Sequence, residues 1–167
     1  AVRSYQQTEP QRVELNDLVR SSIEMLKGNR TLRNRLKIEC ALTEPDVIRA
    51  VPMEIMQVVD NLVTNAAEAM QDTDRYELKL ETAASDGYVR LSVIDQGVGI
   101  AFCDGCMKQK CEQCRRFAIG KTTKVDGAGI GMVYVQHIVS EMNGLLRIHS
   151  TKNTGTTMSL YFPAHSE

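Results

Sequence analysis

The sequence predicts a two-layer α/β sandwich built as one domain, and three observations support this. Apolar residues recur with helical spacing around residues 16–26, 52–71 and 128–142, whereas alternating apolar and polar residues mark strands between and after these segments. Helices and strands therefore alternate along the chain, which favours helices packed on a sheet. A chain of 167 residues is also long enough to bury one sizeable core.

The first half of the chain is expected to form two helices and two short strands after a polar segment. We expect residues 1–12 to be a linker from an upstream domain and residues 13–167 to form the domain itself. Asn16 is a candidate N-cap of the first helix, and Pro52 suits the first position of the second helix. The expected elements are a helix over 16–26, strands over 36–42 and 47–51, and a helix over 52–71. Cys40, in the first strand, is expected to be an ordinary buried thiol.

The second half is expected to form two hairpins, a long loop and a third helix. Segments 76–83 and 88–95 alternate in polarity, and Ser-Asp-Gly at 85–87 is typical of a tight hairpin turn. Residues 97–127 are rich in glycine and cysteine and have no period, so we expect a long functional loop there. The remaining expected elements are a helix over 128–142, capped at Asn143-Gly144, and strands over 145–150 and 156–162.

Composition and charge exclude several classes of protein. The formal net charge is -1, which gives no bulk attraction to nucleic acid, so no nucleic-acid partner is expected. No apolar stretch approaches the ~20 residues that span a bilayer, and the polar start lacks the apolar segment of a signal peptide. We therefore expect a cytoplasmic domain, and a membrane-anchored parent protein stays open.

The predicted helix over 52–71 carries two asparagines on one face. Asn61 and Asn65 lie one turn apart, on the side opposite the apolar stripe. Their neutral amide oxygens suit a hard cation such as Mg²⁺ held together with phosphate oxygens. The alternative is a solvated polar stripe that also includes Gln57 and Glu68.

Two glycine-rich loops complete a candidate pocket. The strand over 88–95 runs into Asp95-Gln-Gly97-Val-Gly99-Ile100, where the glycines let backbone pack against a flat ligand while the acid accepts a hydrogen bond. Alone this signal is weak, because Asp-x-Gly turns are common. The segment Gly127-Ala-Gly129-Ile130-Gly131-Met132 opens directly into a helix, and its amides can bind phosphate. The spacing differs from the G-x-G-x-x-G of dinucleotide-binding folds.

Four motifs in order resemble the catalytic domain of histidine kinases in the GHKL superfamily, closest to the nitrogen-regulator type. Gln57-Val-Val-Asp-Asn61-Leu-Val-Thr-Asn65-Ala is similar to the N box, and the loop after Asp95 to the first glycine box. Phe117-Ala-Ile-Gly-Lys121-Thr122-Thr123-Lys124 resembles the F box and ATP lid, and 127–132 the second glycine box. The resemblance covers nearly all of 13–163, including the closing Gly155-Thr-Thr-Met-Ser-Leu-Tyr-Phe-Pro163. It implies the Bergerat fold, a mixed, mainly antiparallel sheet covered on one face by about three helices.

The resemblance also implies ATP and Mg²⁺ as ligands and assigns roles to individual residues. Asp95 would bind the adenine amino group, and Asn65 would ligate Mg²⁺. Asn61 would assist at the phosphates, as would Lys121 and Lys124 when a lid over about 101–126 closes. The nucleotide-contacting set is Asn61, Asn65, Asp95, Gly97, Gly99, Ile100, Phe117, Lys121, Thr122, Thr123, Lys124, Gly127, Gly129, Ile130, Gly131, Met132 and Thr157.

The residue at position 61 separates branches of the superfamily. Gyrases, mismatch-repair ATPases and the large heat-shock chaperones carry a glutamate there that activates water, and an amide cannot take that proton. The resemblance therefore implies an ATP:protein-histidine phosphotransferase, with a GHKL ATPase, an anti-sigma serine kinase or a regulatory metal- or redox-sensing module as alternatives. His137, His149 and His165 lack the His-Glu or His-Asp pattern of family acceptors. The acceptor is thus expected on an upstream dimerising domain, with a response regulator as indirect partner. The isolated domain should be a monomer and its parent a dimer.

Four cysteines in the expected lid depart from the family pattern. Cys103, Cys106, Cys111 and Cys114 form C-x2-C-x4-C-x2-C, and paired C-x2-C units are a strong metal signal. The central spacing is short for a zinc ribbon and differs from the common iron–sulfur spacing. We expect Zn²⁺ first, and keep an Fe–S cluster, a thiol–disulfide switch and unliganded thiols as alternatives.

Overall fold

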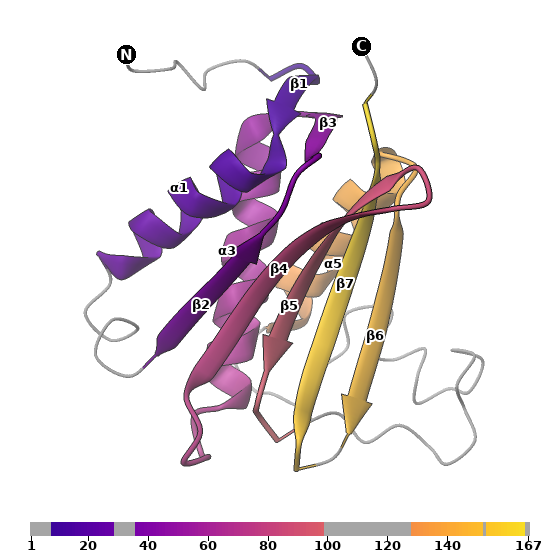
Figure 1. The fold of residues 1–167 in the computed structure, drawn as a ribbon. Helices are drawn as coiled ribbons and strands as arrows, with labels where there is room; N and C mark the ends of the chain where they lie inside the picture. The colour runs from indigo at the N-terminus through magenta and orange to yellow at the C-terminus, as the bar shows by residue number, and fades with distance from the viewer. Residues whose placement is uncertain (1–7, 29–35, 99–127, 152, 166–167) are drawn as a thin grey trace, which may run out of the picture.

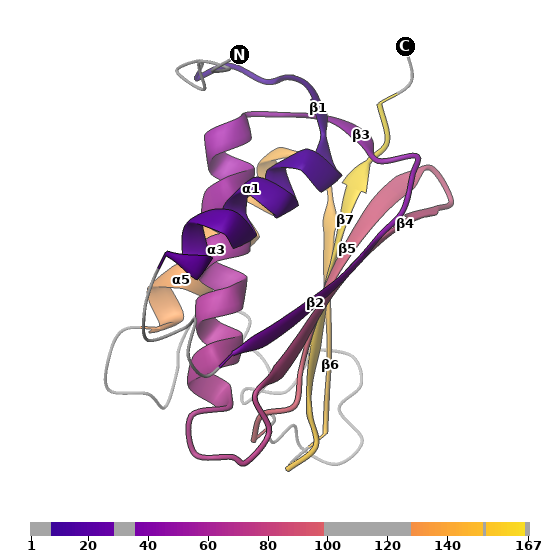
Figure 2. The ribbon, with the colours of Figure 1, turned by 60° about the vertical axis from the view of Figure 1, so that its left-hand side comes forward.

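The computed structural model describes residues 8–28, 36–98, 128–151 and 153–165. Within these ranges the chain forms two layers, with three helices on one face of a five-stranded sheet (Figure 1). Figure 2 shows the sheet nearly edge-on, with the helices on one side only. The predicted two-layer sandwich is confirmed. No helix in the described ranges is long and apolar enough to cross a bilayer.

All helices and strands predicted from the sequence are present, with ends that differ by at most two residues. The helices are α1 (Leu15–Lys27), α3 (Pro52–Ala69) and α5 (Ala128–Glu141). The strands of the main sheet are β2 (Lys37–Leu42), β4 (Glu77–Ser85), β5 (Tyr88–Asp95), β6 (Leu145–Thr151) and β7 (Gly155–Pro163). A second, two-stranded sheet pairs β1 (Gln11–Glu14) with β3 (Val47–Ala50).

The main sheet has the order β2-β4-β5-β7-β6. Only β2 and β4 are parallel, and the other neighbours are antiparallel, so the sheet is mixed and mainly antiparallel as expected. The turn between β4 and β5 is tight, because Asp86 (φ 46) and Gly87 (φ 83) both adopt the left-handed conformation of a two-residue hairpin turn. Asn143 (φ 57) ends α5 in the same conformation, which confirms the predicted cap.

The core lies between the sheet and the helices. Alternate residues of β5 and β7, such as Leu91 and Leu160, are fully buried on the helix-covered face. They meet apolar side chains of all three helices, among them Leu15, Leu62 and Val135. The strands thus present one face to the core, and their other face carries mostly polar side chains.

Two expectations about the N-terminal region are wrong. Residues 11–14 form β1, a strand that was not predicted because Gln-Arg-Val-Glu contains a single buried apolar residue, Val13. Asn16 is not the N-cap of α1: the cap position is Glu14, which makes no side-chain capping bond. Asn16 is instead buried inside the helix, with its backbone N–H donating to Asp46 Oδ2 at 2.9 Å.

The Asn16 side chain fastens α1 to the sheet. Its Nδ2 donates to the Thr43 carbonyl at 2.9 Å, and its Oδ1 accepts from Thr82 Oγ1 at 2.6 Å. Thr82 lies on β4, so this buried network joins the first helix, the loop after β2 and the sheet. A further correction concerns Cys40, which is exposed on β2, because β2 is an edge strand with a neighbour on one side only.

Candidate functional site

The Asp95 carboxylate is held at the C-terminal end of β5. Asp95 is 8% exposed, and its Oδ1 accepts hydrogen bonds from the backbone N–H of Gly97 at 2.8 Å and of Thr156 at 3.2 Å. Thr156 lies directly opposite Asp95 in the β5–β7 register. Two backbone donors on one oxygen fix the carboxylate in orientation, which suits a residue that must accept a hydrogen bond from a ligand in a defined direction.

Two glycines allow the close approaches that shape this end of the sheet. A Cβ at Gly97 would lie 2.6 Å from the Ala69 carbonyl oxygen, so the loop after β5 packs directly on the last turn of α3. Val98 N–H donates to that same carbonyl at 3.0 Å. Gly155 has φ +146, and a Cβ there would lie 2.1 Å from the Asp95 carbonyl oxygen. Backbone from α3, β5 and β7 therefore converges around Asp95.

The Asn61 side chain extends from α3 toward the start of α5. Its Oδ1 accepts from Gln57 Nε2 at 2.9 Å, and its Nδ2 reaches the Gly131 carbonyl at 3.4 Å. A Cβ at Gly131 would lie 3.5 Å from the Asn61 side-chain amide carbon. The structure thus brings the second glycine-rich segment against the asparagine face of α3. The free backbone N–H groups of a helix N-terminus attract anions, and the N-terminus of α5 lies beside Asn61.

Asn65 occupies the next turn of α3, between Asn61 and the carbonyl of Ala69. Both asparagines are half-buried, whereas Gln57 is exposed. No hydrogen bond to another described residue engages the Asn65 side chain.

The structure places Thr157 away from Asp95 and Met132 in the core. The register pairs Thr157 with Ile94, so Thr157 lies on the helix-free face of the sheet, away from the Asp95 side. Thr156, which the sequence reasoning missed, faces Asp95 instead. Residues directly opposite each other in paired strands lie on the same face of the sheet, so the pairing of β5 with β7 identifies Thr156. The Met132 side chain is 4% exposed and belongs to the core, so it contributes packing at the start of α5.

The remaining predicted site residues lie outside the described ranges. These are Gly99, Ile100, Phe117, Lys121, Thr122, Thr123, Lys124 and Gly127, together with Cys103, Cys106, Cys111 and Cys114. Gly129 and Ile130 belong to α5, but the structure does not describe their side chains. Among the described residues no cluster of three or more histidine, cysteine, aspartate or glutamate side chains has the arrangement of a metal site.

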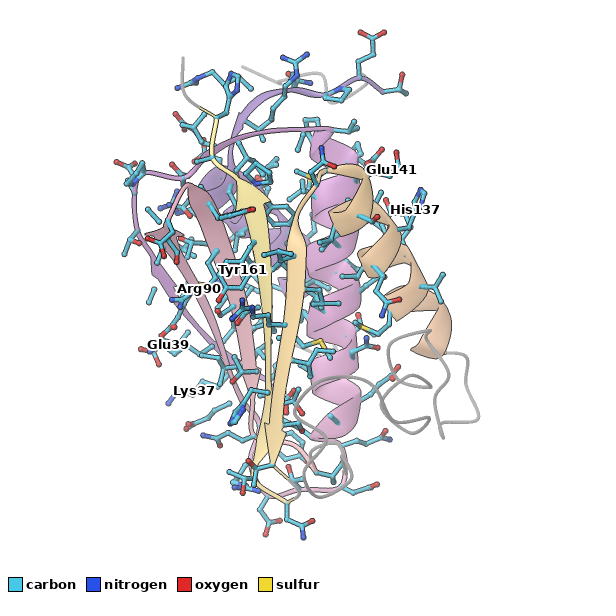
Figure 3. The ribbon with its side chains drawn as sticks, turned by 90° about the vertical axis from the view of Figure 1, so that its right-hand side faces the viewer. Lys37, Glu39, Arg90, His137, Glu141 and Tyr161 are labelled. Atoms are coloured by element: carbon cyan, nitrogen blue, oxygen red, sulfur yellow. The ribbon has the colours of Figure 1, made fainter. Side chains whose placement is uncertain are left out.

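The histidines lie away from Asp95. His137 is on the outward face of α5 with Glu141, whereas Arg90, Tyr161 and Lys37 lie on the helix-free face of the sheet (Figure 3). His149 is exposed on β6, opposite Thr157 and therefore on that same helix-free face. His137 is thus on the helix side of the sheet but points outward from α5, and His149 is on the opposite face from Asp95.

Residues 50–166 match a family model described as histidine kinase-, DNA gyrase B-, and HSP90-like ATPase. The chain therefore belongs to this family. It is 30% identical over 158 residues to sensor histidine kinase ZraS of Escherichia coli (strain K12), which covers 93% of this chain and 31% of the relative. The non-motile and phage-resistance protein of Caulobacter vibrioides is 28% identical over 160 residues, 93% of this chain and 18% of that protein. The chain thus spans about a third of the length of ZraS.

Solved structures confirm the fold. The catalytic domain of histidine kinase ThkA superimposes with a TM-score of 0.73 at 23% identity, covering 93% of this chain and 96% of that one. The mycobacterial sensor histidine kinase MprB gives a TM-score of 0.73 at 20% identity, over 95% of this chain and 99% of that one. Full-length ShkA in complex with AMPPNP gives 0.72 at 24% identity, over 98% of this chain and 33% of that one. The domain is homologous to the catalytic domains of sensor histidine kinases.

Proposed function

We propose that this domain binds Mg-ATP and donates the γ-phosphoryl group to a histidine on a separate upstream domain of the same kinase, within a two-component system. The observation that carries the proposal is the Asp95 carboxylate, fixed by two backbone amides at one end of β5. Support comes from the family and from the ShkA structure, which holds AMPPNP.

Each part of the ligand has a chemically suitable partner. The Asp95 carboxylate would accept a hydrogen bond from the adenine amino group, since an ionised carboxylate only accepts. The amide oxygen of Asn65 fits Mg²⁺, which prefers oxygen ligands and keeps several waters. Asn61 and the N-terminus of α5 would meet phosphate oxygens. Bound Mg²⁺ would neutralise charge on those oxygens.

The proposed reaction is transfer to an imidazole nitrogen. The nitrogen lone pair forms a bond to the γ-phosphorus, the bond from that phosphorus to the bridging oxygen of ADP breaks, and ADP leaves with the electron pair. The amide of Asn61 cannot act as a general base for water, so hydrolysis has no proton acceptor at this position. The domain's contribution is then positioning and electrostatic stabilisation.

The isolated domain is expected to hydrolyse ATP at near-background rate. Adding an upstream domain with the acceptor histidine should give phosphoprotein that is stable to base and labile to acid. Phosphate release measures the first result, and radiolabel retention after acid or base treatment measures the second. Robust hydrolysis by the isolated domain would contradict the proposal and favour the ATPase alternative; a base-labile, acid-stable product would favour the serine kinase.

Within the parent protein, we propose the upstream dimerising domain as direct partner and a response regulator as the next recipient. We propose that the domain works in the cytoplasm, where ATP is available; the parent protein can be soluble or membrane-anchored. In this setting the isolated domain is a monomer that depends on its parent for access to the acceptor.

A metal centre at Cys103, Cys106, Cys111 and Cys114 is a second proposal, resting on their spacing alone. Purified protein should contain one metal centre per chain, either one zinc ion or one iron–sulfur cluster, and Cys106→Ser with Cys111→Ser should remove it. Elemental analysis with a visible spectrum distinguishes zinc from an iron–sulfur cluster. Cys40→Ser is the matched control, because Cys40 lies outside the motif. A double variant that retains full metal content would overturn this proposal.

A further inference from the structure

A series of hydrogen bonds joins three loops at the Asp95 end of the molecule. Arg75, in the segment after α3, donates from Nη2 to the Asn153 carbonyl at 2.7 Å, across 78 positions of sequence. Asn153 N–H in turn donates to the Val98 carbonyl at 2.7 Å. Val98 N–H donates to the Ala69 carbonyl at 3.0 Å.

The series closes on itself through the chain. Ala69 is the last residue of α3, and the backbone of residues 70–74 connects it to Arg75, where the series began. Thr73 stabilises this connecting segment, because its Oγ1 donates to the Met70 carbonyl at 2.9 Å and accepts from Arg75 N–H at 3.3 Å. Met70 is fully buried. Arg75 therefore projects from a segment that is itself fixed to the core, and its guanidinium completes a closed ring.

This ring borders the candidate site at three places. Val98 follows Gly97, whose N–H holds Asp95 Oδ1. Asn153 lies two residues before Gly155, where β7 passes against the Asp95 backbone. Ala69 lies one helical turn after Asn65. The ring therefore fixes the position of the Asp95 loop relative to both α3 and the β6–β7 turn.

We infer that Arg75 is a positioning residue for the adenine end of the nucleotide site, acting through Asn153 and Val98 rather than by contact with ATP. The inference rests on the proposed function. Asn153 adopts a left-handed conformation (φ 63) in an exposed turn. Without the guanidinium, the hydrogen bond from Asn153 N–H to Val98 is the one that still joins this turn to the ring among the described residues, so the Asp95 loop has more freedom. Looser placement of Asp95 should reduce discrimination between adenine, which offers an amino group, and guanine, which offers a carbonyl at that position.

The first test needs no nucleotide. In Arg75→Ala, amide hydrogen exchange at Val98 and Asn153 should accelerate about fivefold, the effect of losing one hydrogen bond of ordinary net strength. Exchange at buried β5 positions such as Leu91 should not change. Arg75→Lys keeps a donor and should restore part of the protection. Unchanged exchange at both amides, or an equal acceleration throughout the sheet, would overturn the inference.

The second test measures the ratio of GTP to ATP dissociation constants. Arg75→Ala should lower this ratio about fivefold, while Arg20→Ala, an exposed arginine of α1 paired with Asp17, leaves it unchanged. Equal weakening for both nucleotides would indicate a merely structural role and overturn the inference. Failure of the wild-type domain to bind ATP would instead refute the proposed function, so the two failures are distinguishable.

Discussion

Asp95→Asn is expected to abolish the stabilisation of the domain by Mg-ATP. Asparagine keeps an Oδ1 that can accept from Gly97 and Thr156, so the nucleotide-free protein should retain its stability. The Nδ2 group of asparagine is a hydrogen-bond donor, as is the adenine amino group, so the two cannot hydrogen-bond to each other. At an ATP concentration 100 times the dissociation constant, the wild type should gain about 2.7 kcal/mol and the variant almost nothing.

Thermal unfolding with and without Mg-ATP measures this difference. Asp86→Asn is the matched control: it makes the same substitution at the opposite end of the same hairpin, where asparagine also tolerates the left-handed conformation. The control should keep the full ATP-dependent shift. An unchanged shift in Asp95→Asn would contradict the assignment of Asp95 to adenine.

Gly155→Ala is expected to produce the largest loss of stability. The residue has φ +146, which L side chains rarely adopt, and a Cβ would lie 2.1 Å from the Asp95 carbonyl oxygen. Strain and displacement of β7 together should cost roughly 2–4 kcal/mol of unfolding free energy, measured by urea denaturation. ATP binding should weaken as well, because Thr156 N–H would move away from Asp95.

Gly87→Ala is the control for Gly155→Ala, because it imposes the unfavourable backbone conformation without a steric clash. Gly87 is also left-handed (φ +83), but a Cβ there would meet no atom within 4 Å. It should cost only about 1 kcal/mol, the usual conformational penalty. If Gly155→Ala proved no more destabilising than Gly87→Ala, the close approach of β7 to Asp95 would not constrain the fold.

The sequence predicted the regular elements well because their signals are local. The Asp86-Gly87 turn, the helical spacing in α3 and the cap at Asn143 each depend on a few neighbouring residues, and each is confirmed. β1 was missed because a four-residue strand with one buried side chain has almost no period. Its pairing with β3 is a tertiary contact that local patterns do not encode.

The sequence predicted part of the arrangement of the candidate site residues. Asp95, Asn61 and Gly131 were assigned to one site by motif, and the structure places Asn61 against Gly131. The sequence alone did not show that Thr156, and not Thr157, shares the Asp95 face, because two adjacent threonines differ only in the face that the β5–β7 register gives them. Arg75 carries no local signal, since its partner Asn153 is distant in sequence.

The two-stranded sheet lies at the end of the molecule opposite Asp95. β3 meets the C-terminal end of the chain through a bridge between Ile48 and Ala164, and Ala164 N–H donates to Gly87 in the far turn of the β4–β5 hairpin. β5 separates that turn from Asp95 by eight residues, about 26 Å of strand. β1 therefore lies at the end of the domain opposite Asp95 (Figure 1). In the proposed kinase the upstream acceptor domain would join at this end, so its connection and the candidate nucleotide site would be separated by the length of the sheet.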